Sequence, residues 1–174
     1  MKKYLIMILI IIAISIMFFS IFSACSNFLN KSKFTNTFAI QNVKTSKNLR
    51  PYNASKNDST RIILYNHKKW KCMTWEFIQF DDSIYLLKNL YTQKTFEPSS
   101  LQQEMTLWQQ PLIESHIQYW EFIKQSDETY LIRLKNTDLY ITITSDKKNS
   151  DVILMPKQNS DTQLWRLLPQ NPLF

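Results

Sequence analysis

The chain has 174 residues, of which 44% are apolar and 14% aromatic, enough to bury the core of one domain and to exclude general disorder. It contains no glycine, which excludes glycine-rich phosphate-binding loops and leaves turns of positive φ to Asn, Asp or strained residues. The net charge of +7 is a modest basic excess that suits an anionic surface but identifies no partner.

The beginning of the chain has the organisation of a secretion signal. Two lysines precede an apolar run over residues 4–22, and two small residues stand immediately before Cys25. This order predicts a signal peptide over residues 1–24. The letters FSAC resemble the lipobox of bacterial lipoproteins, which implies that Cys25 carries lipid such as palmitate and, with Ser26 next, that the protein is sorted to the outer membrane. The alternative is an uncleaved anchor helix, because the run approaches the roughly 20 residues that span a bilayer.

The next segment, residues 25–37, is predicted to be the lipidated cysteine followed by a polar tether. It is rich in Asn, Ser, Lys and Thr and has no sustained periodicity. If Cys25 carries lipid, Cys72 is the one remaining thiol and cannot form an internal disulfide. For Cys72, a buried core position is favoured over a reactive or intermolecular role, because free cysteine is usually buried.

Residues 38–174 contain three repeats, marked by the strings MTWEFIQ, QYWEFIK and QLWRLLP. Their tryptophans, Trp75, Trp120 and Trp165, are spaced by 45 residues in both intervals. Each repeat consists of short alternating or apolar runs between polar clusters, which indicates about four strands per repeat. The prediction is an all-β domain, a β-trefoil, since the alternative propellers generally have four or more blades. The repeated tryptophans are predicted to lie in its core.

Two of these strings match a family signature. Gln118–Tyr119–Trp120 and Gln163–Leu164–Trp165 carry the QxW motif of ricin-type β-trefoil lectins, and Met73–Thr74–Trp75 is a degenerate copy. The chain therefore resembles that family over its predicted mature length. With the lipobox and tether, it also resembles the lectin-like, non-catalytic A and C subunits of cytolethal distending toxins. That resemblance implies binding to a target cell surface and to a nuclease subunit.

The lectin resemblance implies a sugar pocket made of an acid, an aromatic platform and an amide near the signature tryptophan. Repeat two has Glu97, Trp108 and Gln118 at these positions, with Ile117 where such lectins commonly have Asn. The matching acid and platform positions are expected to be Arg50 and Tyr65 in repeat one, and Tyr140 and Met155 in repeat three. Repeat two is thus the expected carbohydrate site. The alternative is that Trp108 only packs and that Glu97 is a solvated turn residue.

A second candidate surface is the string YNHKKWKC of repeat one, expected on a hairpin loop. Tyr65, His67 and Trp70 stand there beside Lys68 and Lys69. A tryptophan among cations suits a contact with a partner, an acidic glycan or a phospholipid interface. The alternative is that Trp70 folds back over the barrel end and that the lysines are solvated.

The residues that commonly carry catalysis are not grouped in the sequence. His67 and His116 lack further ligands at metal-binding spacing, and Asp81 and Asp82 are expected at a hairpin tip. We therefore expect no cofactor, no metal and no enzyme activity, and export argues against nucleic acid as a partner. Two functions stay open. One is a lipid-anchored, carbohydrate-binding or toxin-delivery subunit, surface-exposed or released with its complex. The other is an envelope or secretion-complex lipoprotein whose trefoil binds protein.

Overall fold

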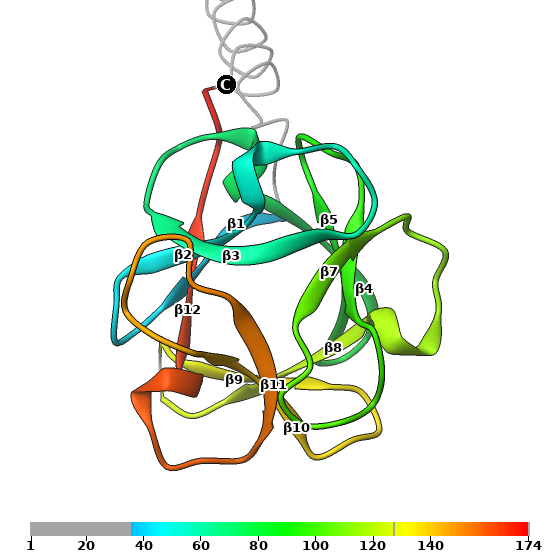
Figure 1. Cartoon of the computed structure of the whole chain (residues 1–174), viewed down its shortest axis with the longest axis vertical. Helices are drawn as coiled ribbons and strands as arrows, with labels where there is room; N and C mark the ends of the chain where they lie inside the picture. Colours follow the sequence, from blue (N-terminus) through cyan, green and yellow to red (C-terminus); the bar gives the residue numbers. More distant parts are fainter. Residues whose placement is uncertain (1–35, 127, 174) are drawn as a thin grey trace, which may run out of the picture. The chain divides into compact units, whose positions relative to one another are not determined.

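The computed structural model describes residues 36–126 and 128–173, and twelve strands run through this part of the chain (Figure 1). They are β1 (Thr37–Asn42), β2 (Lys47–Pro51), β3 (Thr60–Asn66), β4 (Trp75–Asp81), β5 (Ile84–Asn89), β6 (Thr95–Pro98), β7 (Leu107–Gln110), β8 (Tyr119–Lys124), β9 (Tyr130–Leu134), β10 (Leu139–Ile143), β11 (Val152–Pro156) and β12 (Trp165–Pro169). Short 3-10 turns join some of them: η1 (Tyr52–Ala54), η2 (Lys71–Met73), η3 (His116–Gln118) and η4 (Asp161–Gln163). The all-β prediction is confirmed.

The strands form where side chains alternate between core and surface. In β8, Trp120 and Phe122 are buried, whereas Glu121 between them faces outward. Glu121 lies opposite Arg133 of β9, and Arg133 Nε donates to its carboxylate over 2.9 Å. A period of two therefore gives β8 a buried and a more exposed face, whereas β2 and β10 are buried over four successive residues and so on both faces.

Six strands close into a barrel in which every neighbour is antiparallel. The order around it is β1, β4, β5, β8, β9 and β12, and β12 pairs back with β1. The closing pair runs from Phe38 opposite Pro169 to Asn42 opposite Trp165. The barrel is therefore complete within residues 37–169, and its pairing leaves none of the six strands as an open edge.

The other six strands form three hairpins, β2–β3, β6–β7 and β10–β11, whose second strands surround the centre of the view in Figure 1. Three equivalent junctions join these hairpins to one another. They are Arg61 opposite Trp108, Thr106 opposite Ile153, and Ile63 opposite Asp151. A six-stranded barrel with a cap of three hairpins is a β-trefoil, so the predicted architecture is confirmed.

The repeated tryptophans are fully buried, as predicted. Trp75 Nε1 donates to the Leu49 carbonyl over 3.2 Å, and Trp165 Nε1 donates to the Ile141 carbonyl over 3.1 Å. Trp120 differs, since no acceptor for its Nε1 occurs in the described part of the chain. Its ring packs on Phe96 instead, with 5.0 Å between the ring centroids.

Turns of positive φ are made without glycine, and only some of them use asparagine. The residues with positive φ are Ser46, Asn53, Ala54, Ser59, Gln93, Glu104, Glu114, Asn136 and Asn149. For residues that carry a Cβ atom this region is sterically costly, and asparagine tolerates it best. Some of these turns are therefore formed by strained residues that the rest of the fold holds in place.

The N-terminal predictions fall mostly outside the described residues. The signal peptide, Cys25 and residues 26–35 of the tether belong to the part that is not described. Thr37, the last residue assigned to the tether, is the first residue of β1. Within residues 36–126 and 128–173, no helix has the length and apolar character needed to cross a membrane.

Candidate functional site

The predicted site residues of repeat two come together at the β6–β7 hairpin. Glu97 of β6 lies directly opposite Trp108 of β7 in the strand register. Both side chains are partly exposed. Gln118, at the end of η3, donates from Nε2 to Glu97 Oε2 over 2.6 Å. The acid, the aromatic ring and the amide that the sequence singled out are thus neighbours in space.

Gln118 holds the acid in place rather than lining a binding surface, because it is fully buried. Its Nε2 also donates to the Pro111 carbonyl over 2.9 Å, and its Oε1 accepts from the Ile113 backbone N–H over 3.1 Å. The Gln118 bond occupies Oε2 of Glu97, and no described residue donates to the other carboxylate oxygen, Glu97 Oε1. Glu97 is therefore oriented by the protein and retains an acceptor that faces no protein donor.

A hollow of about 480 Å³ lies over Glu97 and Trp108. We call it the repeat-two hollow; it is lined by Ser59, Glu97, Pro98, Ser99, Trp108, Gln110 and Ile117. Its volume is within the range of roughly 300–1,000 Å³ typical of small-ligand pockets. One partly exposed indole, one carboxylate and several uncharged polar groups are suited to stacking a sugar ring and bonding its hydroxyls.

One wall of this hollow comes from repeat one, which the sequence did not predict. Ser59 lies in the β2–β3 loop, and Gln110 Nε2 donates to its hydroxyl over 3.4 Å. The buried Gln109 holds the same loop by donating to the carbonyls of Ser55 and Asn57 over 3.1 and 2.8 Å. No spacing within a single repeat could have identified Ser59, because hairpin packing across the cap brings it to the site.

The register corrects three of the positions expected in the other repeats. Ile63, not Tyr65, lies opposite Arg50 in repeat one. In repeat three the pair equivalent to Glu97 and Trp108 is Thr142 and Ile153, rather than Tyr140 and Met155. The error was a slip of two residues along β3 in repeat one and along both β10 and β11 in repeat three. Such a slip keeps every side chain on the same face, so the alternation of burial could not reveal it. With the corrected pairs, repeats one and three both lack the acid and the aromatic platform, so repeat one also loses the platform that Tyr65 was expected to provide.

Repeat three keeps the signature glutamine without a sugar pocket. Gln163 Nε2 donates to Thr142 Oγ1 over 2.8 Å and to the Pro156 carbonyl over 2.9 Å, while its Oε1 accepts from the Gln158 N–H over 2.6 Å. These bonds match those of Gln118 one repeat earlier. Because they form where acid and platform are both missing, the glutamine has a structural role that is separate from ligand binding.

Repeat one places a cation where repeat two has the acid. Arg50 is only 6% exposed, and its Nε donates to the Pro51 carbonyl over 3.0 Å. Its guanidinium carbon lies 4.4 Å from the centre of the Tyr65 ring. Met73 stands where repeat two has Gln118, so this repeat lacks the amide as well. A sugar site of the repeat-two type cannot form here.

Cys72 is buried, as predicted, and it is the free cysteine of the described residues. Burial raises the pKa of the Cys72 thiol, and the nearby positive charge of Arg50 opposes this without reversing it. Together with Ala54, Trp70 and Tyr91, Cys72 lines a small apolar hollow of about 200 Å³. The thiol is therefore kept in its neutral form at neutral pH, which disfavours nucleophilic chemistry.

The second candidate surface differs from its prediction. Residues 67–70 connect β3 to η2 and are no hairpin loop, because β3 pairs with β2 and β7 while β4 pairs with β1 and β5. Trp70 is partly buried and packs against Tyr65 with 6.3 Å between ring centroids. His67 is exposed, and its Nδ1 lies 3.2 Å from Asn48 Oδ1. Trp70 thus folds back on the domain.

The acidic pair and the histidines belong to no metal-ligand cluster of the described residues. Asp81 ends β4 and Asp82 follows it in the tight turn to β5, the hairpin tip that the sequence predicted. No cluster of three or more potential metal ligands occurs in residues 36–126 and 128–173.

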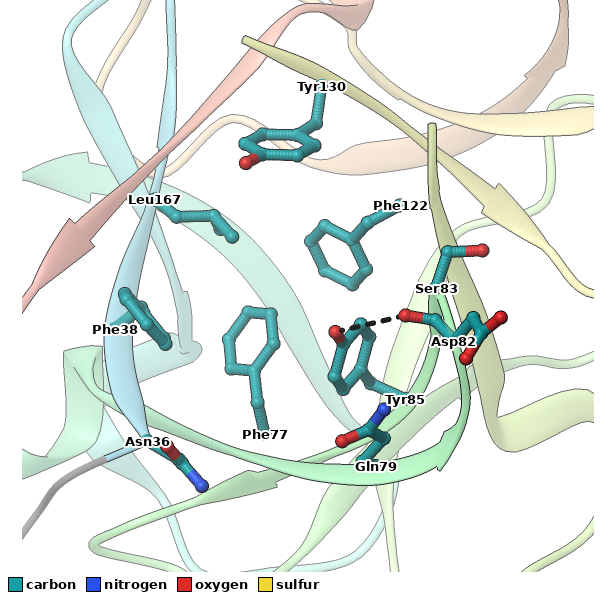
Figure 2. Close-up of a pocket in the computed structure, with 10 residues that line it drawn as sticks. All are labelled: Asn36, Phe38, Phe77, Gln79, Asp82, Ser83, Tyr85, Phe122, Tyr130 and Leu167. Atoms are coloured by element: carbon teal, nitrogen blue, oxygen red, sulfur yellow. Dashed lines mark hydrogen bonds between the residues drawn. The ribbon is translucent and has the colours of Figure 1, made fainter. Parts of the chain in front are cut away.

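The barrel also has a hollow at the end remote from the cap, shown in Figure 2. We call it the barrel hollow. Its volume is about 370 Å³, and it is lined by Asn36, Phe38, Phe77, Gln79, Asp82, Ser83, Tyr85, Phe122, Tyr130 and Leu167. No sequence pattern predicted this hollow, although Phe77, Phe122 and Leu167 stand at the same place in the three strings that mark the repeats.

Comparison with solved structures agrees with the β-trefoil architecture. A designed three-fold symmetric protein, ThreeFoil, has a TM-score of 0.74 and 20% identity, covering 77% of this chain and 99% of its own. The Rhizoctonia solani agglutinin has a TM-score of 0.69 and 14% identity over 78% and 95% of the two chains. The Macrolepiota procera ricin B-like lectin, solved in complex with lactose, has a TM-score of 0.61 and 16% identity over 76% and 94%. No protein-family profile and no curated protein matches the sequence. At these identities the likeness establishes the fold.

Proposed function

We propose that this protein is a non-catalytic, lectin-like binding module whose sugar site is the repeat-two hollow. The observation that carries the proposal is Glu97, fixed by Gln118 beside Trp108 and left with one unoccupied carboxylate oxygen. A sugar ring stacked on Trp108 can donate hydroxyls to that oxygen. The fold that this chain shares with a lactose-bound ricin B-like lectin supports the same class of ligand. Repeats one and three lack the set, so we expect one sugar per domain.

We further propose that the domain is held at the outer membrane through lipid on Cys25 and acts as a cell-binding or delivery subunit of a toxin-like complex. The support is the FSAC string, the polar segment behind it and the QxW repeats. Each buried acyl methylene contributes about 0.8 kcal/mol to membrane binding, so two acyl chains suffice for a stable anchor. Metabolic labelling with a palmitate analogue in wild type and Cys25→Ser tests the anchor, and label retained by Cys25→Ser would refute it.

The sugar site is tested by comparing fragment 34–174, wild type and Trp108→Ala, on a broad glycan array. This fragment contains every barrel and cap strand. We expect the wild type to bind and Trp108→Ala to lose binding by about tenfold or more, because a stacked aromatic is worth roughly 0.5–1.5 kcal/mol beyond its buried area. Trp70→Ala is the matched control, as it removes a partly buried tryptophan outside the hollow and should keep binding.

Circular dichroism must show that each variant is folded. If the folded wild type binds no glycan, the sugar site is refuted. In that case the second function, a scaffold that binds protein in an envelope or secretion complex, becomes the better account. The corrected pairs Arg50 with Ile63 and Thr142 with Ile153 favour it, since two of three sites lack the sugar-binding set. Co-purification of a stoichiometric protein partner from membranes, in place of glycan binding, distinguishes the two.

A further inference from the structure

The interior of the barrel hollow is lined by one aromatic or aliphatic side chain from each barrel strand. Phe77, Phe122 and Leu167 hold equivalent positions on β4, β8 and β12, and Phe38, Tyr85 and Tyr130 do so on β1, β5 and β9. Five of these six side chains are aromatic. Neighbouring rings touch, with centroid distances from 5.0 Å for Phe77 and Phe122 to 6.2 Å for Phe122 and Tyr130.

Leu167 breaks the three-fold pattern and leaves room. Where repeats one and two insert the rings of Phe77 and Phe122, repeat three inserts a branched aliphatic side chain. Figure 2 shows the Leu167 side chain between Phe38 and Tyr130, pointing into the hollow. The surrounding rings are held by strand pairing and by their own edge contacts, so they cannot close over this space completely.

The chemistry of the hollow selects its ligand. The six barrel side chains make an apolar interior, and apolar hollows of this kind bind apolar groups in preference to water. The rim is polar, with Asn36, Gln79 and Ser83 among the lining residues. Among the described residues that line it there is no lysine or arginine, and Asp82 is the one with a charge. The site therefore disfavours an anionic head group and suits hydroxyls.

We propose that the barrel hollow binds the hydrocarbon chain of an uncharged, hydroxylated amphiphile, with its head group at the rim. We assign a single extended chain to it because Leu167, in place of a third phenylalanine ring, leaves room along one side of the hollow. This site is separate from the repeat-two hollow, since the two share no lining residue, and it does not depend on the proposed sugar binding.

The experiment titrates fragment 34–174 with decanol, and with adamantanol as the cage-shaped control, by calorimetry and NMR. We expect decanol to bind one per domain and adamantanol to bind at least about tenfold more weakly, because a compact cage has less apolar surface to bury than an extended chain of the same number of carbon atoms. In Leu167→Phe, which supplies the missing ring, decanol affinity should also fall about tenfold or more. Trp108→Ala should bind decanol as the wild type does.

Wild-type NMR tests the location without depending on any variant. Nuclear Overhauser contacts are expected between the decanol chain and the Leu167 methyls and Phe38 ring. Absence of saturable decanol binding, contacts at another surface, or undiminished binding by folded Leu167→Phe would each overturn the proposal.

Discussion

Gln118 and Gln163 are buried glutamines that make the same structural hydrogen bonds in two repeats, but only Gln118 also contacts a candidate site residue. In each, the side-chain Nε2 donates to a proline carbonyl, and Oε1 accepts from the backbone N–H of the residue five positions earlier. The partner of the remaining bond decides what the repeat can do. In repeat two it is the carboxylate of Glu97, and in repeat three it is the hydroxyl of Thr142. A signature glutamine therefore indicates the fold, while its acceptor indicates the site.

The three signature tryptophans allow a residue-scale prediction about stability. Trp165→Phe removes an indole bond to the Ile141 carbonyl, whereas Trp120→Phe removes an N–H that has no acceptor in the described residues. We expect Trp165→Phe to lower the free energy of unfolding by about 0.5–1.5 kcal/mol more than Trp120→Phe. Urea denaturation followed by circular dichroism measures the difference. Equal losses would show that the indole of Trp120 has an acceptor after all.

At the scale of elements, the barrel depends on the closure of β1 with β12. Thr37 and Gln170 seal the end of this pair. Gln170 N donates to the Thr37 carbonyl over 3.0 Å, and the Thr37 hydroxyl donates back to the Gln170 carbonyl over 2.7 Å. The Gln170 side chain extends the seal by donating to Thr74 Oγ1 over 2.6 Å. Residues 133 positions apart in sequence thus complete the fold.

We predict that Thr37→Val destabilises the domain by about 1–2 kcal/mol, because the buried Gln170 carbonyl loses a donor that water cannot replace. Thr144→Val is the control. Its hydroxyl also donates to a carbonyl, that of Asp151 over 2.9 Å, but Thr144 is exposed and water can substitute. The midpoints of urea unfolding of both variants measure the contrast. A loss in Thr144→Val as large as in Thr37→Val would contradict it.

At the scale of the whole molecule, the three repeats have the same strand arrangement but carry different side chains at the position of the candidate site. Repeat two pairs Glu97 with Trp108, repeat one pairs Arg50 with Ile63, and the third pairs residues without charge or ring. The cap also joins the repeats by ion pairs, such as that of Arg61 with Asp151 at 2.7 Å. Because both partners are substantially exposed, this pair contributes little to stability, and the packed core carries most of it.

Cys72 gives a pH prediction for the stability of the whole domain. Its thiol pKa is raised by burial above the ordinary value of 9.0, so the folded state holds this proton more tightly than the unfolded state. The resulting stability is fully present below the unfolded pKa and is lost as pH rises through the folded pKa. We expect the wild type to lose stability more steeply above pH 9 than Cys72→Ala, as followed by urea unfolding at several pH values. Parallel profiles would contradict the raised pKa.

The sequence by itself determined the three repeats, the class of the fold, the core tryptophans and the set Glu97, Trp108 and Gln118. It could do so because these features depend on local alternation and on spacings that recur within each repeat. Only the tertiary structure decided the strand register in repeats one and three, where a slip of two residues leaves the facial pattern unchanged. It also brought Ser59 of repeat one to the repeat-two hollow and opened the barrel hollow beside Leu167. Those features arise from side chains of distant strands meeting in space, and no local pattern records which of them will meet.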